Sequence, residues 1–163
     1  MSEKELFCRY IHEYEKSMYL LAKGIVKNDT DVADILQDAI LKAYTSFDSL
    51  KDKQKFKPWI LRIVHNTAVD FIKKQREILD SDAYEQAITP EAPVDKETQL
   101  TVLEAVHKLN FPYQTVILLY YYDGYSVEKI SEITSTSVVN IRQQLSRGRK
   151  MLANLLNEED FIQ

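Results

Sequence analysis

The segment YSVEKISEITSTSVVNIRQQLSRGRKMLANLL, residues 125–156, predicts two helices separated by a short polar turn. Ser126 is a favourable N-cap for the first helix, expected over 126–134, because its hydroxyl can accept a hydrogen bond from an unpaired backbone N–H. The polar run at 135–137 supplies the turn and a new N-cap. A longer helix follows from about 138 to about 156, with apolar residues recurring along one side. This order of elements is typical of a helix-turn-helix.

The outward face of the second helix is rich in side chains that can recognise DNA. Between Ser137 and Leu152 there are four basic residues and no acid. Arginine can pair with guanine through two hydrogen bonds, asparagine and glutamine with adenine, and further cations can hold phosphates. A charged run is more often a solvated helix face, but the preceding helix, the short turn and the absence of acids favour DNA reading. The candidate contacts are Asn140, Arg142, Gln143, Ser146, Arg147, Arg149 and Lys150.

The composition of the chain indicates an all-α protein. Its 163 residues are enough for one domain or two small ones, and 45% of them are hydrophobic, so a core can be buried. Only three glycines and four prolines are present, too few for a turn-rich β protein, whereas long stretches have helical periodicity. We therefore expect two small helical domains, one of three helices and one of four.

The negative charge of the chain is concentrated in its middle. The net charge of −4 would by itself argue against a nucleic-acid partner. However, residues 80–99 hold six acids and one lysine, while residues 1–79 hold 14 basic and 12 acidic residues. Residues 78–97 also contain two prolines and few large apolar residues. This segment is therefore interpreted as a flexible acidic linker between the two domains, with basic faces on either side.

Several function classes lack support in the sequence. The single cysteine, Cys8, excludes an intramolecular disulfide and a cysteine metal cluster, and the three histidines form no ligand motif. No Gly-rich phosphate loop and no nucleophile–base pairing appear, so we expect neither an enzyme nor a bound cofactor or metal. No signal peptide opens the chain and no apolar run approaches 18 residues, so we expect a cytoplasmic protein without a membrane-inserted segment.

Three amphipathic helices are expected in the N-terminal half, over 3–27, 30–44 and 54–76. The second helix has apolar residues on one side and a polar, acidic face on the other. That face is either merely solvated or a docking surface for a basic or polar partner. Its candidate docking residues are Asp34, Gln37 and Asp38.

The third helix combines positive charge with aromatic rings. From Lys51 to Glu77 there are eight basic residues and three acids, with Phe56 and Trp59 near the start. Basic groups can follow a nucleic-acid backbone while rings stack on unpaired bases, so this combination suits single-stranded nucleic acid. The alternative for the two rings is that they fill the core.

The C-terminal half is expected to open with a helix over 97–109. Pro112 suits the first position of the next helix, because proline has no N–H to lose there. Gly124 suits the end of that helix, and the helix-turn-helix follows directly.

Two parts of the chain resemble known domains. The strings YLLAKGIVKNDTDVADILQDAILKAYTSF and FKPWILRIVHNTAVDFIKKQRE resemble region 2 of bacterial RNA polymerase sigma factors. The matching signs are Asp34, Gln37, Trp59, and the spacing of Asn66 and Asp70 before Lys73 and Lys74. The strings KLNFPYQTVILLYYYDGYSVEKISEIT and VVNIRQQLSRGRKML resemble region 4. The resemblance covers about residues 10–77 and 98–155, and this layout at this length is similar to the extracytoplasmic-function (ECF) class.

The resemblance implies a division of the chain into residues 1–77 as region 2, 78–97 as linker, 98–157 as region 4 and 158–163 as a tail. Region 2 would dock on the clamp helices of the polymerase β′ subunit through the polar face of the second helix, and would recognise and melt the −10 element. The residues implied in that melting are Phe56, Trp59, Arg62, Asn66, Asp70, Lys73 and Lys74.

Region 4 would sit on the β flap and read the −35 element. By family position, the residues facing the −35 bases are Arg142, Gln143, Ser146 and Arg147. The implied partners are core RNA polymerase, promoter DNA and an anti-sigma factor, the usual regulator of the class. Departures from the family pattern leave the promoter sequence open. Among them, Asn140 stands where threonine is common and Gly148 where alanine is common.

Two other functions remain open at this point. One is a stand-alone helix-turn-helix regulator, which would bind duplex DNA without polymerase and would not need the basic and aromatic third helix. The other is a helical adaptor that binds polymerase without reading DNA. Such an adaptor would not need arginine with asparagine and glutamine on the outward face of the last long helix.

Overall fold

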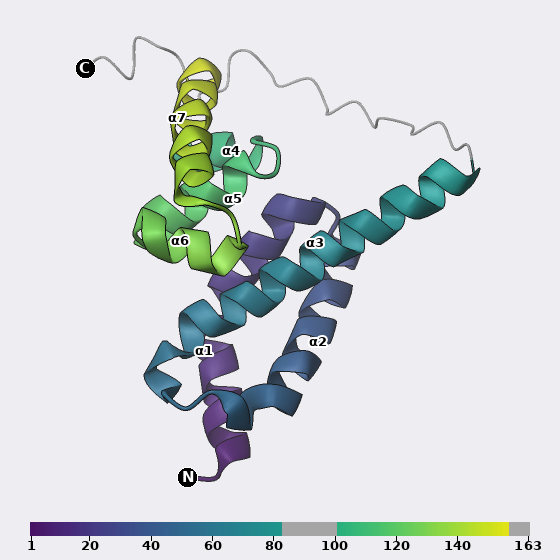
Figure 1. Cartoon of the computed structure of the whole chain (residues 1–163), viewed down its shortest axis with the longest axis vertical. Coiled ribbons are helices and arrows are strands. Elements are labelled where there is room, and N and C mark those ends of the chain that lie inside the picture. Colours follow the sequence, from purple (N-terminus) through teal and green to yellow (C-terminus); the bar gives the residue numbers. More distant parts are fainter. Residues whose placement is uncertain (83–100, 157–163) are drawn as a thin grey trace.

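The computed structural model describes residues 1–82 and 101–156, with side chains up to residue 79 in the first range. Within these ranges the chain is helical and has no β-strand. The helices are α1 (Glu3–Val26), α2 (Asp29–Ser46), α3 (Phe56–Asp82), α4 (Val102–His107), α5 (Tyr113–Ile117), α6 (Val127–Thr134) and α7 (Val138–Leu155) (Figure 1). Short 3-10 turns lie between α2 and α3, and a π-helical turn, η3 (Leu118–Tyr122), follows α5. The prediction of an all-α fold with a three-helix and a four-helix part is confirmed.

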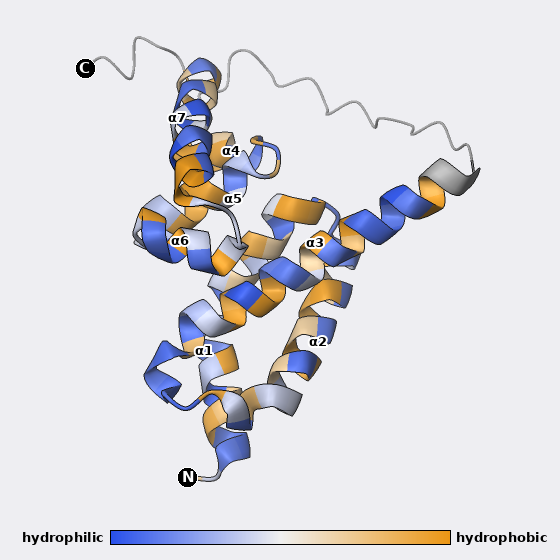
Figure 2. Ribbon diagram, viewed as in Figure 1, coloured by the Kyte–Doolittle hydropathy of each residue, from blue (hydrophilic) through white to orange (hydrophobic). Residues whose placement is uncertain are grey.

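The first three helices form a bundle in which each packs against the other two. Lys27 ends α1 in a left-handed conformation (φ 65°), and the Asn28 side chain then accepts the backbone N–H of Thr30 (2.8 Å) to start α2. Hydrophobic and hydrophilic residues alternate along these long helices, as amphipathic packing requires (Figure 2). Met18 and Ile35 lie in the core of this bundle, each at most 2% exposed.

The third helix is longer than the sequence predicted. The linker was expected to begin at residue 78, but α3 continues to Asp82. The physical reason is that no proline or glycine occurs between residue 78 and Pro90, so nothing local stops the helix. The rest of the predicted linker, up to residue 97, lies outside the described residues.

The C-terminal four helices begin later than expected. Within the described residues α4 starts after Thr101, whose hydroxyl accepts the backbone N–H of Glu104 (3.2 Å) while the Glu104 carboxylate accepts the N–H of Thr101 (3.1 Å). This reciprocal capping box fixes the start of the helix. The predicted start at residue 97 lies outside the described residues. The next helix ends as predicted near Gly124, which has a φ of 75°, but its last turn is the π-helical η3.

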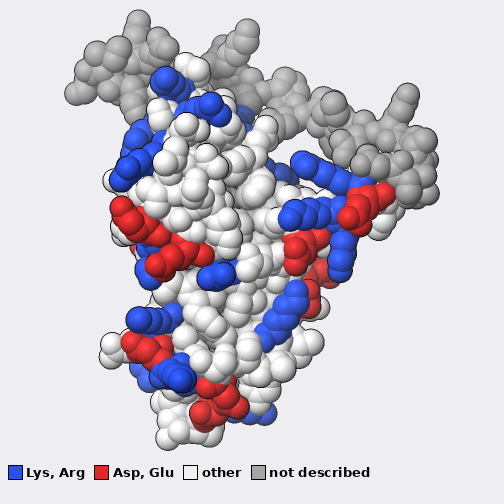
Figure 3. Space-filling model, viewed as in Figure 1, with Lys and Arg blue, Asp and Glu red and all other residues white. Residues whose placement is uncertain are grey.

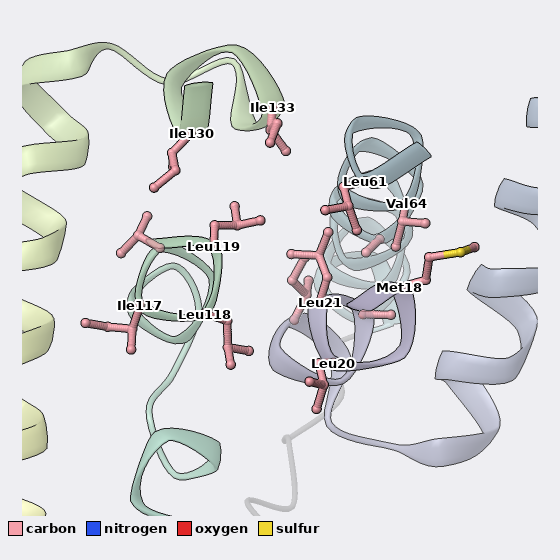
Figure 4. Packing of buried hydrophobic residues seen from close by; sticks show 14 of the residues in the cluster. Met18, Leu20, Leu21, Leu61, Val64, Ile117, Leu118, Leu119, Ile130 and Ile133 are labelled. Carbon is pink, nitrogen blue, oxygen red and sulfur yellow. The ribbon is translucent and has the colours of Figure 1, made fainter. Parts of the chain in front are cut away.

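The two bundles share one continuous core. Helix α6 packs against α3, and α5 packs against α1. In Figure 4 the side chains of Leu119 and Ile133 point from the C-terminal bundle toward Leu21 and Leu61 of the N-terminal one. All four of these side chains are at most 2% exposed. None of the helices in the described ranges is long and apolar enough to cross a membrane.

Candidate nucleic-acid interface

The helix-turn-helix predicted from the sequence is formed by α6 and α7. The Ser126 hydroxyl accepts the backbone N–H of Lys129 (3.1 Å) at the start of α6, and the Ser137 hydroxyl accepts that of Asn140 (3.2 Å) at the start of α7. Between the helices, Ser135 is left-handed (φ 54°). Both N-caps are those expected from the sequence, and they orient α7 across the end of α6.

The inward side of α7 is apolar and closely packed. Ile141, Leu145, Gly148 and Leu152 are buried. A Cβ atom at Gly148 would lie 3.1 Å from Cγ1 of Ile117, which is closer than a normal packing contact. Glycine at this position therefore lets α7 approach α5 more closely than alanine would. The sequence showed only that alanine is common at this position in the family, and not why glycine fits here.

The outward side of α7 carries the predicted DNA contacts. All seven of them, Asn140, Arg142, Gln143, Ser146, Arg147, Arg149 and Lys150, are exposed. Figure 3 shows basic residues gathered over α7, next to an acidic patch over α6. Glu128 of α6 lies beside the reading face, with its carboxylate 3.9 Å from the Arg142 guanidinium. Both of these side chains are about two-thirds exposed, so the pair is weak.

One of the seven candidates is already engaged within the protein. The Nε of Arg149 donates to the Tyr121 hydroxyl at 2.6 Å, and its guanidinium carbon lies 5.6 Å from the ring centres of both Tyr120 and Tyr121. Tyr120 and Tyr121 of η3 therefore fix the position of the Arg149 guanidinium. Sequence reasoning missed this partner, although the run of three tyrosines before Asp123 was visible.

In the N-terminal bundle, a groove between α2 and α3 brings two predicted sets together. It has a volume of about 230 Å³ and is lined partly by Asp34 and Asp38 from the docking set and by Asp70 and Lys74 from the melting set. Lys42 lies between them, with its Nζ 3.2 Å from the Asp38 carboxylate and 3.4 Å from the Thr67 hydroxyl. Four further candidates are exposed but do not line this groove, namely Gln37, Arg62, Asn66 and Lys73.

The two aromatic candidates of α3 have different environments. Phe56 is only 1% exposed and lies in a cluster of rings, with ring centres 5.0 Å from Tyr10 and 5.9 Å from Phe7. Its ring cannot stack on an unpaired base in this fold. The prediction that Phe56 takes part in melting is therefore wrong, because Phe56 is a core residue. Trp59 is only partly buried, with its ring centre 5.6 Å from that of Phe56.

Sequence comparison identifies the family. The sigma-70 region 2 profile matches residues 10–78, and the sigma-70 region 4 profile matches residues 99–152. The chain is 31% identical to RNA polymerase sigma factor SigV of Bacillus subtilis (strain 168) over 160 residues, which are 97% of this chain and 95% of that protein. It is 30% identical to the ECF RNA polymerase sigma factor SigW of the same organism, over 96% of this chain and 91% of that protein. This chain belongs to the ECF class of sigma-70 factors.

Solved structures have the same fold as this sigma factor. A sigma factor RpoE, in complex with the anti-sigma factor NepR from Bartonella quintana, aligns with a TM-score of 0.71 at 24% identity, over 91% of this chain and 95% of that one. CnrH, in complex with the cytosolic domain of CnrY, aligns with a TM-score of 0.62 at 21% identity, over 94% of this chain and 89% of that one. As a member of its class, the sigma factor binds core RNA polymerase and directs promoter-specific transcription. The region 2 match contains the groove between α2 and α3, and the region 4 match contains all of α6 and most of α7.

Proposed function

We propose that the sigma factor divides promoter recognition among three surfaces. The polar face of α2, with Asp34, Gln37 and Asp38, docks on the clamp helices of the polymerase β′ subunit. Helix α3 holds the opened −10 strand, and α7 reads the −35 duplex while region 4 sits on the β flap. The observation that carries this proposal is the exposed, acid-free face of α7 on one bundle, together with a groove on the other bundle that joins docking and melting candidates.

On α7, the proposed roles differ between residues. Arg142, Gln143 and Ser146 face the −35 bases, Arg147 leans from the same face to a backbone phosphate, and Asn140 and Lys150 flank them. Arg149 contacts phosphate rather than a base edge, because Tyr120 and Tyr121 already hold one side of its guanidinium. Phosphate contacts position a protein on the duplex, whereas base contacts specify the sequence.

On α3, the proposed melting surface consists of Trp59, Arg62, Asn66, Asp70, Lys73 and Lys74. Trp59 is the ring available for stacking, since Phe56 is in the core. The lysines attract the backbone of the displaced strand. Asp70 shares its groove with Asp34 and Asp38, so a strand held on α3 would run beside the polymerase contact.

The sigma factor supplies no catalytic group in this proposal, because the polymerase carries out nucleotide addition in the cytoplasm. We also infer an anti-sigma factor as a regulatory partner. The sigma factor RpoE with this fold was solved in complex with the anti-sigma factor NepR, and CnrH, which has the same fold, in complex with the cytosolic domain of CnrY.

The proposal is tested by run-off transcription with core polymerase on a promoter library. We expect defined transcripts only when sigma factor and core enzyme are both present, and co-elution of the two on size exclusion. A stand-alone regulator would bind duplex promoters tightly without core enzyme and give no run-off product. An adaptor would co-elute with core enzyme but select no promoter from the library. Either result would contradict the proposal.

A further inference from the structure

A buried carboxylate joins the two bundles. Asp123 follows the π-helical turn η3 and precedes Gly124, and its side chain is only 4% exposed. Its backbone N–H donates to the Leu118 carbonyl at 3.0 Å, and that of Tyr125 donates to the Leu119 carbonyl at 3.0 Å. Asp123 thus lies between these wide turns and the positive φ of Gly124 (75°). π-Turns of this kind are rare and often occur at functional positions.

The partners of Asp123 come from the other bundle. The Ser17 hydroxyl of α1 donates to Oδ1 at 2.8 Å, and the Nζ of Lys57 in α3 lies 3.0 Å from the same oxygen. The Lys57 ammonium is also 5.9 Å from the ring centre of Tyr14 and 5.6 Å from that of Tyr125. Burial raises the pKa of Tyr125 to about 12, and the Asp123 charge adds to this effect. We call Asp123, Ser17 and Lys57 the latch.

A second polar contact crosses the same boundary. The Nζ of Lys27, at the end of α1, donates to the carbonyls of His107 (3.0 Å) and Leu109 (2.8 Å), and to the Gln114 side chain. His107 is the last residue of α4, and a cation beside its carbonyl interacts favourably with the negative end of that helix. Gln114 is fully buried and lies against the backbone of α1 at Gly24.

Other parts of the boundary oppose closure. Beside α3 there is a cavity of about 290 Å³, lined by neutral side chains of both bundles. Two of them, His65 of α3 and Thr115 of α5, have buried polar atoms (Nδ1 and Oγ1) with no hydrogen-bond partner among the described residues. A buried polar atom without a partner destabilises the state that buries it. These two polar atoms therefore favour separation of the bundles, while the apolar contacts across the boundary favour closure.

The closed arrangement conflicts with simultaneous reading of both promoter elements. By their names the −35 and −10 elements lie about 25 base pairs apart, or about 85 Å of duplex at about 3.4 Å per base pair. In the structure α7 packs on α6, and α6 packs on α3. Packed helices lie about 8–10 Å apart, so α7 and α3 are separated by about 20 Å where α6 joins them. The residues that connect the bundles, 83–100, can span up to roughly 60 Å when extended.

Closure also affects the charge of the melting helix. The pKa of Glu132, on α6, is lowered chiefly by its hydrogen bond to Lys129 and, to a smaller extent, by the charges of Lys55 and Arg62. The Glu132 carboxylate is thus close enough to influence the basic start of α3. In the closed arrangement this acid reduces the positive potential that would attract a DNA strand.

We propose that the latch holds the unbound sigma factor in a closed, inactive arrangement, and that it must break on core polymerase before both promoter elements are read. This inference rests on the proposed assignment of the −10 and −35 surfaces to α3 and α7. The latch itself is a property of the free chain, so it can be tested without promoter DNA.

The first experiment measures the distance between the bundles. Spin labels are attached to the native, exposed Cys8 on α1 and to an Asn154→Cys substitution on α7, which is also exposed. We expect one short distance in the free protein and a longer one after core polymerase is added. Asp123→Asn should add the long distance without polymerase, and if the parent is about 90% closed it should tighten polymerase binding by roughly tenfold. Glu128→Gln, which removes the same charge from an exposed site of the same bundle, is the matched control and should behave like the parent.

A second experiment locks the bundles together. A Cβ atom at position 24 would lie 3.2 Å from Cγ of Gln114, so cysteines at both positions are close enough for a disulfide. The triple variant Cys8→Ser, Gly24→Cys, Gln114→Cys should transcribe after reduction and lose most of that activity after oxidation, while Cys8→Ser alone should transcribe under both conditions.

The results separate the latch from the proposed function. Distances in Asp123→Asn that match the parent, or equal transcription by oxidised and reduced lock variants, would overturn the latch. If Cys8→Ser does not direct transcription at all, the proposed function fails, while the distance measurement still decides whether Asp123 holds the bundles together.

Discussion

The ring of Phe56 holds the beginning of α3 against α1. It stacks near Tyr10 and meets Phe7 and Phe47 edge-on. Replacing a buried phenylalanine with alanine removes apolar contacts and leaves a cavity, so Phe56→Ala should lower the free energy of unfolding by about 3–5 kcal/mol. Phe56→Leu keeps most of the volume and should cost less than about 1.5 kcal/mol. Urea unfolding followed by circular dichroism measures both changes. A loss of −10 melting in Phe56→Leu with unchanged stability would instead support a direct contact with DNA.

The two arginines of α7 make a sharper test of base reading. Arg142 and Arg147 are five positions apart, or about 140° around the helix, so both cannot point at the groove floor. We expect Arg142 to read a base, because the N-terminal end of a recognition helix usually enters the groove. Arg142→Ala should then relax −35 preference by about 1–3 kcal/mol at one base pair. Arg147→Ala should weaken binding to all sequences. It should also reduce, by about one, the magnitude of the slope of log affinity against log salt concentration.

Transcription from a library with a randomised −35 element measures both effects. Glu128→Gln is a useful companion, since it removes the exposed carboxylate 3.9 Å from Arg142 without changing α7. If neither arginine variant alters base preference, readout through the shape of the duplex becomes the better account.

Single positions differ in how well the sequence predicts them. The exposed face of α7 was predictable, because helical periodicity separates its four buried positions from the polar ones. Phe56 was ambiguous, because an aromatic residue beside lysines fits both a core and a stacking platform. Arg149 was assigned to DNA on charge alone, and its contact with Tyr121 depends on how η3 turns.

The polar face of α2 is the proposed docking surface as a unit. Asp34 and Gln37 are exposed and one turn apart, while Val32, Ile35 and Ala39 are buried on the other side of the helix. Asp34→Lys with Gln37→Ala should therefore reduce affinity for core polymerase and leave helix content unchanged. Surface-immobilised core enzyme and circular dichroism provide the two readouts. Unchanged affinity with an intact fold would exclude this face as the docking surface.

The C-terminal half of α3 should act in strand opening. Lys73 and Lys74 are exposed, and Lys74 lines the groove shared with Asp34. Replacing both lysines with alanine should reduce open-complex formation more than −35 duplex binding, measured by permanganate footprinting and gel shift. A pre-melted promoter should partly rescue the variant. Equal loss on duplex and pre-melted templates would indicate that the lysines only hold phosphates.

Two helix starts followed the sequence because a capping serine marked them, whereas the capping box of Thr101 and Glu104 was not used to place the start of α4. Ser126 and Ser137 gave the starts of α6 and α7 correctly, because each side chain caps its own helix. The end of α3 was placed too early, since an acidic composition was given more weight than the absence of proline and glycine before Pro90. The π-helical form of η3 has no comparable local signal, because LLYYY also fits an ordinary helix.

The arrangement of the two bundles could not be predicted at all. The sequence placed Asp123 at the end of a helix and offered it no partner, because Ser17 is 106 positions away in the chain. Periodicity shows which residues of α1, α3, α5 and α6 are apolar, but not that they bury one another across the bundles. The sequence therefore predicted each half and its proposed DNA contacts, while the latch depends on long-range packing.

The boundary between the bundles should respond to acid. Burial lowers the pKa of His65, and burial together with the Lys27 and Lys23 charges lowers that of His107. The side chains lining the cavity beside His65 are all neutral, and they come from the loop before α5, α5, α6, the turn after α6, and α7. Separation of the bundles would expose His65, and would free His107 from Lys27, so their pKa values would return toward the ordinary value of about 6.5.

The open arrangement therefore binds more protons than the closed one. Closure is fully favoured above the ordinary histidine pKa and is lost as the pH falls below it. The distance between labels at Cys8 and residue 154 should lengthen as the pH drops from about 7.5 to about 5.5, the range over which histidine takes up its proton. The double variant His65→Asn, His107→Asn should flatten this response, whereas His12→Asn, at a side chain that is 85% exposed, should leave it intact. A pH response that persists in the double variant would assign the acid sensitivity to other groups at the boundary.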